Sequence, residues 1–365
     1  MVGKERKWVF LTLSTRWDRV DADVPIYKAS ARGRAVPLLK ALTSSYCVNQ
    51  CAYCALRAGR RTTRARWSPE DLARLGLKLW REGVIEGVFL TSTVDGDPDR
   101  SMEAELEAAE RLRRMGFRGY IHLRVMPGCS RHLIQQAAEL ANRIGVNLEA
   151  SRPSLFNELC PDKGGYRVDL VKRLEWCIEE ARSARRRGLK VDVDTQVVVG
   201  ALDDDDLSYL ELTQRLYESQ VLRRVYFSGF EPIKDTPLQS RPPCPRLREV
   251  ALYQASFLLR DYVFTVDDLK PLLDEHDMLP RGVNLKLAYA KANRDLYPVD
   301  VNKASLHELL RVPGIGPRSG LFLLKSRDVR GRLSLSDVKQ ALGTIRFRRA
   351  SRFLALGSRR LDDFS

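Results

Sequence analysis

The stretch Tyr46–Cys54 reads YCVNQCAYC and places Cys47, Cys51 and Cys54 at the spacing C-x3-C-x2-C. Three thiolates this close together can each hold one iron of a cubane iron–sulfur cluster. No fourth cysteine lies nearby in the sequence, so the fourth iron would stay open to a substrate or cosubstrate. The alternative is a zinc site, but structural zinc requires four closed ligands, and the nearest histidines are far along the chain. The spacing therefore predicts an iron–sulfur cluster.

The residues around the triad extend this prediction. Val36–Ser44 (VPLLKALTS) is a short apolar run with β-branched members, which predicts a buried strand just before the cysteines. The aromatic Tyr53 precedes the last cysteine. A C-x3-C-x-aromatic-C motif directly after a strand resembles the radical S-adenosylmethionine (SAM) superfamily. That resemblance implies a partial α/β barrel with the cluster loop after its first strand.

Length and composition set the class of protein. The chain has 365 residues and 44% hydrophobic residues, enough for one large domain and a small one. The sequence contains no run of 18 apolar residues, so no membrane span is expected. Its first twenty residues lack the features of a signal peptide. Seven cysteines with a tight triad suit a reducing compartment, so we expect a cytoplasmic protein without a membrane partner.

The charge is strongly basic and unevenly distributed. Lysine and arginine number 62 against 47 acidic residues, a net charge of +15, which favours a polyanionic partner. Between Lys325 and Arg360 there are 11 basic residues and two acidic ones. A second basic cluster without acids follows the cysteine triad: Arg57, Arg60, Arg61, Arg64 and Arg66.

Strand-like and helix-like segments alternate after the triad, which predicts a parallel sheet wrapped by helices. The expected strands are Val36–Ser44, Gly87–Thr93, Tyr120–Met126, Val146–Ser151, Val191–Gly200 and Val225–Phe230. Together they predict an α/β fold of the partial six-stranded (β/α)6 type, with its site at the carboxyl ends of the strands.

Composition divides the chain into modules. A proline-rich stretch at 232–245 marks a boundary. We expect an N-terminal extension at 1–30, the barrel at 31–240, a helical connector at 241–298 and a small all-α module at 299–365.

The last module contains Asp300–Arg327, DVNKASLHELLRVPGIGPRSGLFLLKSR, which closely resembles a helix-hairpin-helix motif. Its glycines let the backbone approach a phosphate, and amides at the start of the second helix point toward it. The alternative is a helical hairpin used for protein contact. Ser334–Gly343 starts a possible degenerate second copy. The predicted nucleic-acid-binding residues are Gly314, Ile315, Gly316, Arg318 and Lys325.

A radical SAM barrel followed by a helix-hairpin-helix resembles a family of radical SAM proteins described as DNA modification or repair proteins. The likeness covers most of the chain, including the strand-six stretch YFSGFEPIKDTPL. It implies an enzyme that generates a 5′-deoxyadenosyl radical and modifies or repairs DNA. The alternatives are an enzyme that modifies RNA or tRNA and a non-catalytic iron–sulfur protein that binds DNA.

The same resemblance assigns site residues. Cys47, Cys51 and Cys54 would bind a 4Fe-4S cluster whose open iron takes S-adenosyl-L-methionine, and Tyr53 would lie by the adenine. Where the superfamily usually has Gly-Gly-Glu, this chain has Thr91–Asp95, so Asp95 would replace the glutamate that meets the methionine amine. The remaining cofactor-binding candidates are Ser92, Thr93, Glu149 for the ribose, Gln196 and Val198 for the adenine, and Phe230. An electron donor such as a ferredoxin or flavodoxin is also implied.

Four cysteines fall outside the triad: Cys129, Cys160, Cys177 and Cys244. Their scattered spacing favours buried single cysteines over a second cluster. A further alternative is that Cys129 acts as a hydrogen-atom donor in the reaction.

Overall fold

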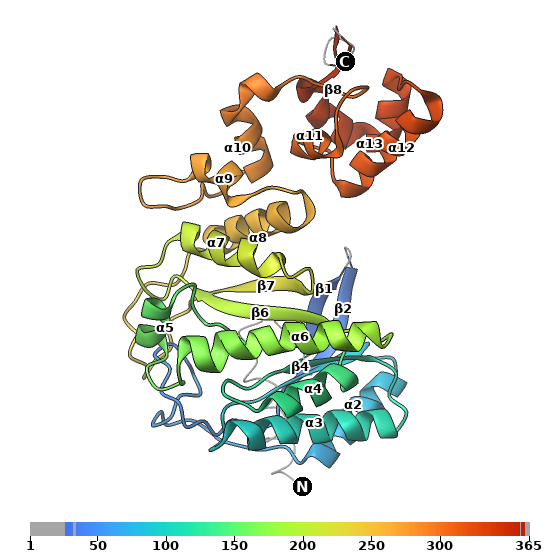
Figure 1. Ribbon diagram of the computed structural model, residues 1–365. Helices are drawn as coiled ribbons and strands as arrows, with labels where there is room; N and C mark the ends of the chain where they lie inside the picture. Colours follow the sequence, from blue (N-terminus) through green and yellow to red (C-terminus); the bar gives the residue numbers. More distant parts are fainter. Residues whose placement is uncertain (1–25, 32–33, 358, 362–365) are drawn as a thin grey trace. The chain divides into compact units, whose positions relative to one another are not determined.

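A computed structural model describes residues 26–31, 34–357 and 359–361. The chain divides into two compact units (Figure 1). The first, here called the barrel unit, extends to Asp204 and includes Ser219–Cys244. The second, the C-terminal unit, comprises Asp205–Glu218 and the chain from Pro245 onward.

The barrel unit is built on a seven-stranded sheet that curls into a half-barrel. In spatial order the strands are β1 (Ile26–Ala31), β2 (Arg34–Leu42), β3 (Gly87–Thr91), β4 (Tyr120–Arg124), β5 (Arg143–Gly145), β6 (Asp192–Val199) and β7 (Leu222–Gly229). Strands β2 to β7 are parallel, as the alternation of strands and helices predicted.

The strand count of six was wrong by one. β1, Ile26–Ala31, lies almost entirely in the predicted N-terminal extension at 1–30, and it pairs antiparallel with β2, from Ile26 opposite Leu39 to Ala31 opposite Arg34. Antiparallel neighbours need no crossover helix between them. The alternation that predicted β2 to β7 therefore carried no signal for β1.

The fourth expected strand was also misplaced. The ladder covers Arg143–Gly145, and the predicted segment Val146–Ser151 follows it. Glu149 has a φ of +66°, a left-handed conformation that interrupts an extended strand. Its amide donates to the Gln196 carbonyl at 3.1 Å and its carbonyl accepts from the Val198 amide at 2.7 Å. The Thr195 hydroxyl of β6 also accepts from the Leu148 amide and donates to the Val146 carbonyl, so main-chain and side-chain bonds hold this segment against β6 without a regular ladder.

Helices cover the outer face of the sheet (Figure 1). They are α2 (Pro69–Arg81), α3 (Pro98–Arg114), α4 (Arg131–Leu140), α5 (Pro153–Leu159), the π-helical turn η1 (Tyr166–Val171) and α6 (Lys172–Arg186). Ser68 and Asp97 cap α2 and α3 by accepting hydrogen bonds from main-chain amides, and a proline opens each of these helices.

Alternation along the strands separates two environments. Val88, Leu90, Ile121 and Leu123 are fully buried apolar residues at every second position of β3 and β4. The residues between them, such as His122, lie on the other face, toward the barrel interior. The inner face is therefore available for polar groups, as the sequence predicted.

The C-terminal unit is mostly helical. Its elements are α7 (Asp206–Tyr217), α8 (Arg246–Asp261), α9 (Val266–Leu269), η2 (Lys270–Leu272), α10 (Leu285–Ala292), η3 (Arg294–Leu296), α11 (Leu306–Arg311), α12 (Pro317–Arg330), α13 (Leu335–Ala350) and η4 (Ser351–Phe353). The expectation of an all-α module at 299–365 was wrong in one respect. A small sheet joins β8 (Val299–Asp300), β9 (Leu354–Leu356) and β10 (Arg359–Arg360). These strands are too short to show a sequence period.

None of the helices in the described part of the chain combines the length and apolar character that a membrane span requires.

Candidate cofactor site and hairpin

The cluster loop, residues 43–67 between β2 and α2, carries the three cysteines. Main-chain hydrogen bonds fix it on two sides. The Val48 amide donates to the Val94 carbonyl at 3.0 Å, and the Ala52 amide donates to the Leu159 carbonyl at 2.8 Å. The Gln50 amide also donates to the Asp162 carboxylate. The loop is thus held between the end of β3 and the end of α5.

The three cluster cysteines interact electrostatically with one another, which shows that their thiols face a common region. Burial, and after it the neighbouring Cys51, raise the pKa of Cys54 to about 12. Burial is also the main cause that raises the pKa of Cys47, with Cys51 again contributing. Thiolates in such a place need a cation to become stable, and bound metal deprotonates a coordinating thiol. An iron–sulfur cluster would supply that charge.

The number of donors bears on the two metal hypotheses. Within the described residues, no three His, Cys, Asp or Glu side chains converge on a point suited to a single metal ion. A structural zinc needs four donors around one ion, whereas a cubane cluster has a separate iron for each thiolate and keeps the sulfurs apart. The three thiolates therefore match a cubane cluster, which takes one cysteine for each of three irons.

Cys160 lies beside the triad although it is distant in sequence. The hydrogen bond between the two thiols lowers the pKa of Cys51 and raises that of Cys160. Cys160 follows α5, the helix to which the cluster loop is bonded. Its place after the fourth expected strand puts Cys160 on the active face, but nothing local in the sequence indicates its proximity to Cys51.

Glu149 joins the cluster loop to the barrel. Its side chain is 1% exposed, and one carboxylate oxygen accepts a hydrogen bond from the Tyr53 hydroxyl at 2.8 Å. The other oxygen pairs with the Lys163 ammonium. A carboxylate has about four acceptor positions, so these two bonds leave capacity for a ligand. The structure thus brings together two predicted cofactor-binding residues, Tyr53 and Glu149.

Lys163 was not predicted. Burial alone would lower the pKa of its ammonium, but the Glu149 carboxylate and then the Cys51 thiol raise it well above the usual value. It is the only lysine between the end of β5 and η1, which is the one sequence signal that could have identified it. The cation offsets the buried charge of Glu149 and lies close to a cluster ligand.

The remaining predicted cofactor-binding residues lie on β6 and just after β7. The main chain of Glu149 is bonded to Gln196 and Val198, as described above for the fold. Phe230 is 2% exposed, and its amide donates to the Val199 carbonyl at 2.8 Å. Gln196 and Val198 therefore lie beside Glu149, while Phe230 follows the end of β7.

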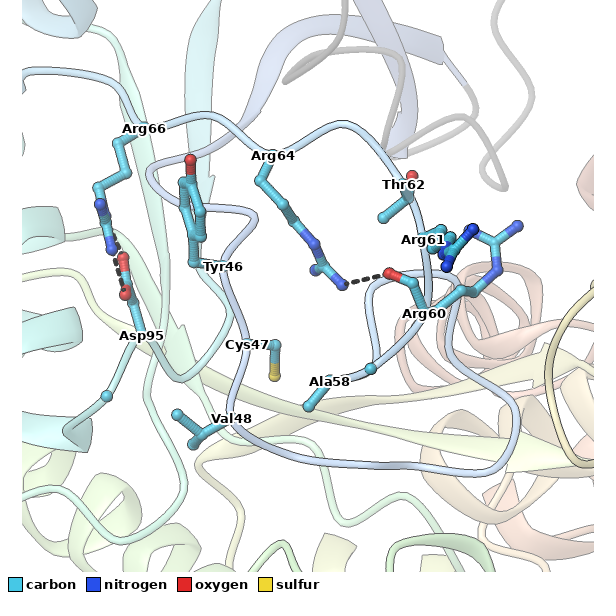
Figure 2. Close-up of a pocket in the computed structure, with 12 residues that line it drawn as sticks. Tyr46, Cys47, Val48, Ala58, Arg60, Arg61, Thr62, Arg64, Arg66 and Asp95 are labelled. Atoms are coloured by element: carbon cyan, nitrogen blue, oxygen red, sulfur yellow. Dashed lines mark hydrogen bonds and ion pairs between the residues drawn. The ribbon is translucent and has the colours of Figure 1, made fainter.

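The residues after β3 lie on the other side of the loop. Asp95 forms an ion pair with Arg66 (Figure 2) and accepts a hydrogen bond from the Ser44 hydroxyl at 2.6 Å. The bond from Arg66 is the largest cause that lowers the pKa of Asp95. Thr93 donates to main-chain carbonyls of the cluster loop, whereas the buried Ser92 hydroxyl has no hydrogen-bond partner among the described residues. Asp95 is therefore an ionised group already engaged by an arginine.

A charged group fills the barrel interior below the cluster loop. Arg124 donates to Asp194 at 2.7 Å, and the His122 ring lies 3.0 Å from the other oxygen of the same carboxylate. His122 stacks on Phe89 with ring centroids 4.0 Å apart. Burial lowers the pKa of His122 to about 4, so the imidazole is neutral near pH 7. Arg124 thus supplies the hydrogen bond to the buried Asp194 carboxylate, whereas His122 Nε2 and the second Asp194 oxygen lie close together without a well-aligned hydrogen bond.

The hairpin between α11 and α12 lies in the C-terminal unit. Gly314 has a φ of +95°, and a Cβ there would lie 2.7 Å from the Arg346 carbonyl oxygen, so only glycine fits. Ile315 is 1% exposed and packs in the core of the unit. Gly316 precedes the first residue of α12. The hairpin conformation therefore follows from the residues that the sequence singled out.

The support of the hairpin was not predicted. Lys286 of α10 is 7% exposed, and its ammonium donates to the Ile315 carbonyl. The ammonium also lies 4.6 Å from the centre of the Tyr262 ring. Arg318 and Lys325, the predicted phosphate contacts on α12, are both exposed.

Comparison with known proteins bears on the barrel unit. Residues 42–212 match the family model described as the radical SAM superfamily. No curated protein matches the chain.

A search of solved structures found matches of low sequence identity. The crystal structure of HydG, a maturase of the [FeFe]-hydrogenase, is 15% identical with a TM-score of 0.47, covering 60% of this chain and 49% of that one. HydG from Carboxydothermus hydrogenoformans is 17% identical with a TM-score of 0.48, covering 60% and 50%. Methylornithine synthase (PylB) is 19% identical with a TM-score of 0.46, covering 71% and 68%. The chain thus spans about half the length of the two HydG chains.

The family match covers the cluster loop and all the intervening strands up to β6. It agrees with the fit of the three cysteines to a cubane cluster, and it confirms the prediction of the cofactors. Residues 42–212 accordingly form a radical SAM domain, whose cofactors are a 4Fe-4S cluster and S-adenosyl-L-methionine.

Proposed function

We propose that the chain is a radical SAM enzyme that modifies or repairs DNA and is held on the DNA backbone by its helix-hairpin-helix. The observation that carries the proposal is the hairpin Val312–Gly316, in which a left-handed Gly314 brings the main chain to the start of α12. Amides at a helix N-terminus bind phosphate oxygens well. Backbone contacts of this kind position a protein without reading the sequence of bases.

The charge of the module supports the same proposal. Exposed basic residues are concentrated on α12, α13 and the segment between them: Arg318, Lys325, Arg330, Arg332, Lys339, Arg346, Arg348 and Arg349. Neutralising phosphates with such side chains releases counterions and gives strong, salt-dependent binding. We therefore assign residues 299–365 as the nucleic-acid-binding module and 241–298 as the connector that follows the barrel.

The barrel unit would carry the chemistry. When bound, the cluster and cosubstrate supply one-electron chemistry, with electrons delivered by a ferredoxin or flavodoxin. The three cysteines would hold the cluster, while Tyr53 and Glu149 would orient the cosubstrate. Gln196, Val198 and Phe230 would enclose its adenine and exclude water.

Two alternatives differ in substrate or in chemistry. An RNA- or tRNA-modifying enzyme would use the same backbone contacts, because phosphates are common to both polymers. A non-catalytic DNA-binding protein would not need a buried carboxylate poised beside the cluster loop, so the Glu149 arrangement favours an enzyme.

The test is anaerobic turnover of the reduced, cluster-loaded protein with SAM and either DNA or RNA, followed by nucleoside mass spectrometry. A new nucleoside mass from DNA, together with 5′-deoxyadenosine, is the expected result. A product from RNA alone would favour the first alternative. Absence of 5′-deoxyadenosine with both polymers would contradict the enzymatic function.

A further inference from the structure

A cavity of about 460 Å³ lies beside Cys47 (Figure 2). It is lined by residues of the cluster loop and of the turn after β3, and its size is that of a small-molecule site. Four arginines and one acidic residue, Asp95, line it, which leaves a formal excess of three positive charges. A concave surface with this charge fits an anionic ligand.

Two of the arginines are committed to the protein. Arg64 donates to the carbonyls of Leu56 and Arg57, each at 2.7 Å, and so holds the cluster loop closed. Arg66 pairs with Asp95 through two hydrogen bonds. These two side chains form the walls of the cavity, and their charge contributes to its field.

The other two arginines, Arg60 and Arg61, have N–H groups that are not used in hydrogen bonds to the described residues. Arg60 uses Nε on the Lys234 carbonyl and one terminal nitrogen on the Ala55 carbonyl, both at 3.0 Å. Its second terminal nitrogen makes no hydrogen bond with any residue that the structure describes. Arg61 is exposed and has neither an ion pair nor a hydrogen bond within the described residues. Neighbouring guanidinium groups with unused donors match the oxygens of a phosphodiester.

The cavity is distinct from the predicted cosubstrate residues. Of those residues only Asp95 lines it, whereas Glu149, Gln196, Val198 and Phe230 do not. Among the three cluster cysteines only Cys47 reaches it. The cavity therefore extends from one edge of the cluster site toward solvent, where a substrate would approach.

An aromatic side chain completes the cavity. Tyr46 is 39% exposed, and its ring lies 4.1 Å from the Arg66 guanidinium carbon. Single-stranded nucleic acid is commonly held by an aromatic platform for a base next to cations for the backbone. Enzymes that act on a base inside a duplex take that nucleotide out of the stack.

We propose that this cavity binds a phosphodiester next to an unstacked nucleotide of the substrate strand, with Arg60 and Arg61 as phosphate ligands and Tyr46 as the platform. The proposal rests on the proposed function, because it names the form in which nucleic acid reaches the cluster. The hairpin would hold the duplex backbone, and the arginine cavity would hold the opened strand. The two sites therefore differ in what they recognise.

The experiment compares two fluorescein-labelled DNA duplexes of one sequence, one perfectly paired and one with a single unpaired nucleotide. Anisotropy is measured anaerobically on the full, cluster-loaded chain at several salt concentrations. The variants are Arg61→Ala and Arg61→Lys. Arg118→Ala is the matched control, because Arg118 is also exposed but precedes β4, at the opposite ends of the strands.

Wild type should bind the duplex with the unpaired nucleotide more tightly. Arg61→Ala should weaken that complex about tenfold, the equivalent of one charge-assisted contact, and lower its salt slope by about one. Arg61→Lys should recover only part of the affinity, since lysine lacks the planar fork. The perfect duplex and the Arg118 control should change little.

Three results would overturn the inference: equal losses on both duplexes, no loss on either, or unchanged DNA affinity with weaker SAM binding or slower reduction by flavodoxin. The last would assign the arginines to the cosubstrate carboxylate or to an acidic electron donor. Nucleoside mass spectrometry tests the proposed function separately. Unmodified nucleosides together with a selective Arg61 effect would refute the modification reaction and leave this binding site standing.

Discussion

Replacing Lys286 by methionine should change how the stability of the C-terminal unit depends on pH. Burial lowers the pKa of this ammonium from 10.5 to about 7. Between these two values the folded protein holds the amine neutral, while the unfolded chain holds it charged. The unfolded state then binds more protons, so the free energy of unfolding rises with pH, by about 1.4 kcal/mol per unit.

The size of the effect on stability follows from the difference between these two pKa values. Below pH 7 the burial cost is fully present, and lowering the pKa of Lys286 from 10.5 to about 7 corresponds to about 5 kcal/mol. Lys286→Met removes this cost but leaves the Ile315 carbonyl without its donor, a loss of about 1–3 kcal/mol. The variant should therefore be more stable than wild type at pH 6 and less stable at pH 10.

Urea unfolding at pH 6, 8 and 10, combined with hydrogen exchange of peptides from α10 to α12, measures this crossing. Lys291→Met is the control, because Lys291 lies on the same helix and is exposed. Parallel stability curves for wild type and Lys286→Met across the range would show that the lysine is charged or solvated when folded, and the reasoning would fail.

The remaining predictions concern the cluster, the cosubstrate, the barrel interior and the hairpin. Alanine at any of the three cluster cysteines should abolish binding of about four iron atoms per chain, whereas Cys177→Ala should retain them; stoichiometric zinc without iron in iron-replete wild type would contradict this. Glu149→Gln should weaken SAM binding at least about tenfold in calorimetry, because a charge-assisted bond worth roughly 1.5–3 kcal/mol is lost; equal affinity would mean that this carboxylate does not meet the cosubstrate. Since the folded pKa of His122 is about 4, wild type should lose about 3 kcal/mol of stability as pH falls from 6.5 to 4, and His122→Gln should lack that loss in urea titrations. Gly314→Ala should reduce DNA affinity for all sequences alike, whereas Gly331→Ala, with a similar φ of +73° but no neighbour within 4 Å, should not; an equal drop in both would point to backbone strain alone.

The sequence predicted most of the architecture because its signals are local. The cysteine spacing, the apolar run before it and the alternation of strands and helices all lie within short windows. The family match confirms the radical SAM domain and its cofactors. The DNA substrate and the roles of individual cofactor-binding residues stay predictions.

What the sequence did not predict depends on contacts between distant segments. The left-handed Glu149 ended a strand that its apolar neighbours had predicted to continue. Lys163 and Lys286 look like ordinary lysines until the fold buries each beside a partner. Cys160 approaches Cys51 only because the loop after α5 returns to the cluster loop.

We expect Tyr53 to couple binding of the cluster to binding of the cosubstrate. It lies between two cluster cysteines along the chain, and its hydroxyl bonds to the carboxylate that we assign to the cosubstrate. Ordering of the loop by the cluster would therefore also order Glu149. Such coupling is reciprocal, so any factor by which the cluster tightens cosubstrate binding is also the factor by which cosubstrate tightens retention of the cluster. SAM should thus slow the loss of iron to a chelator, and the apoprotein should bind SAM weakly.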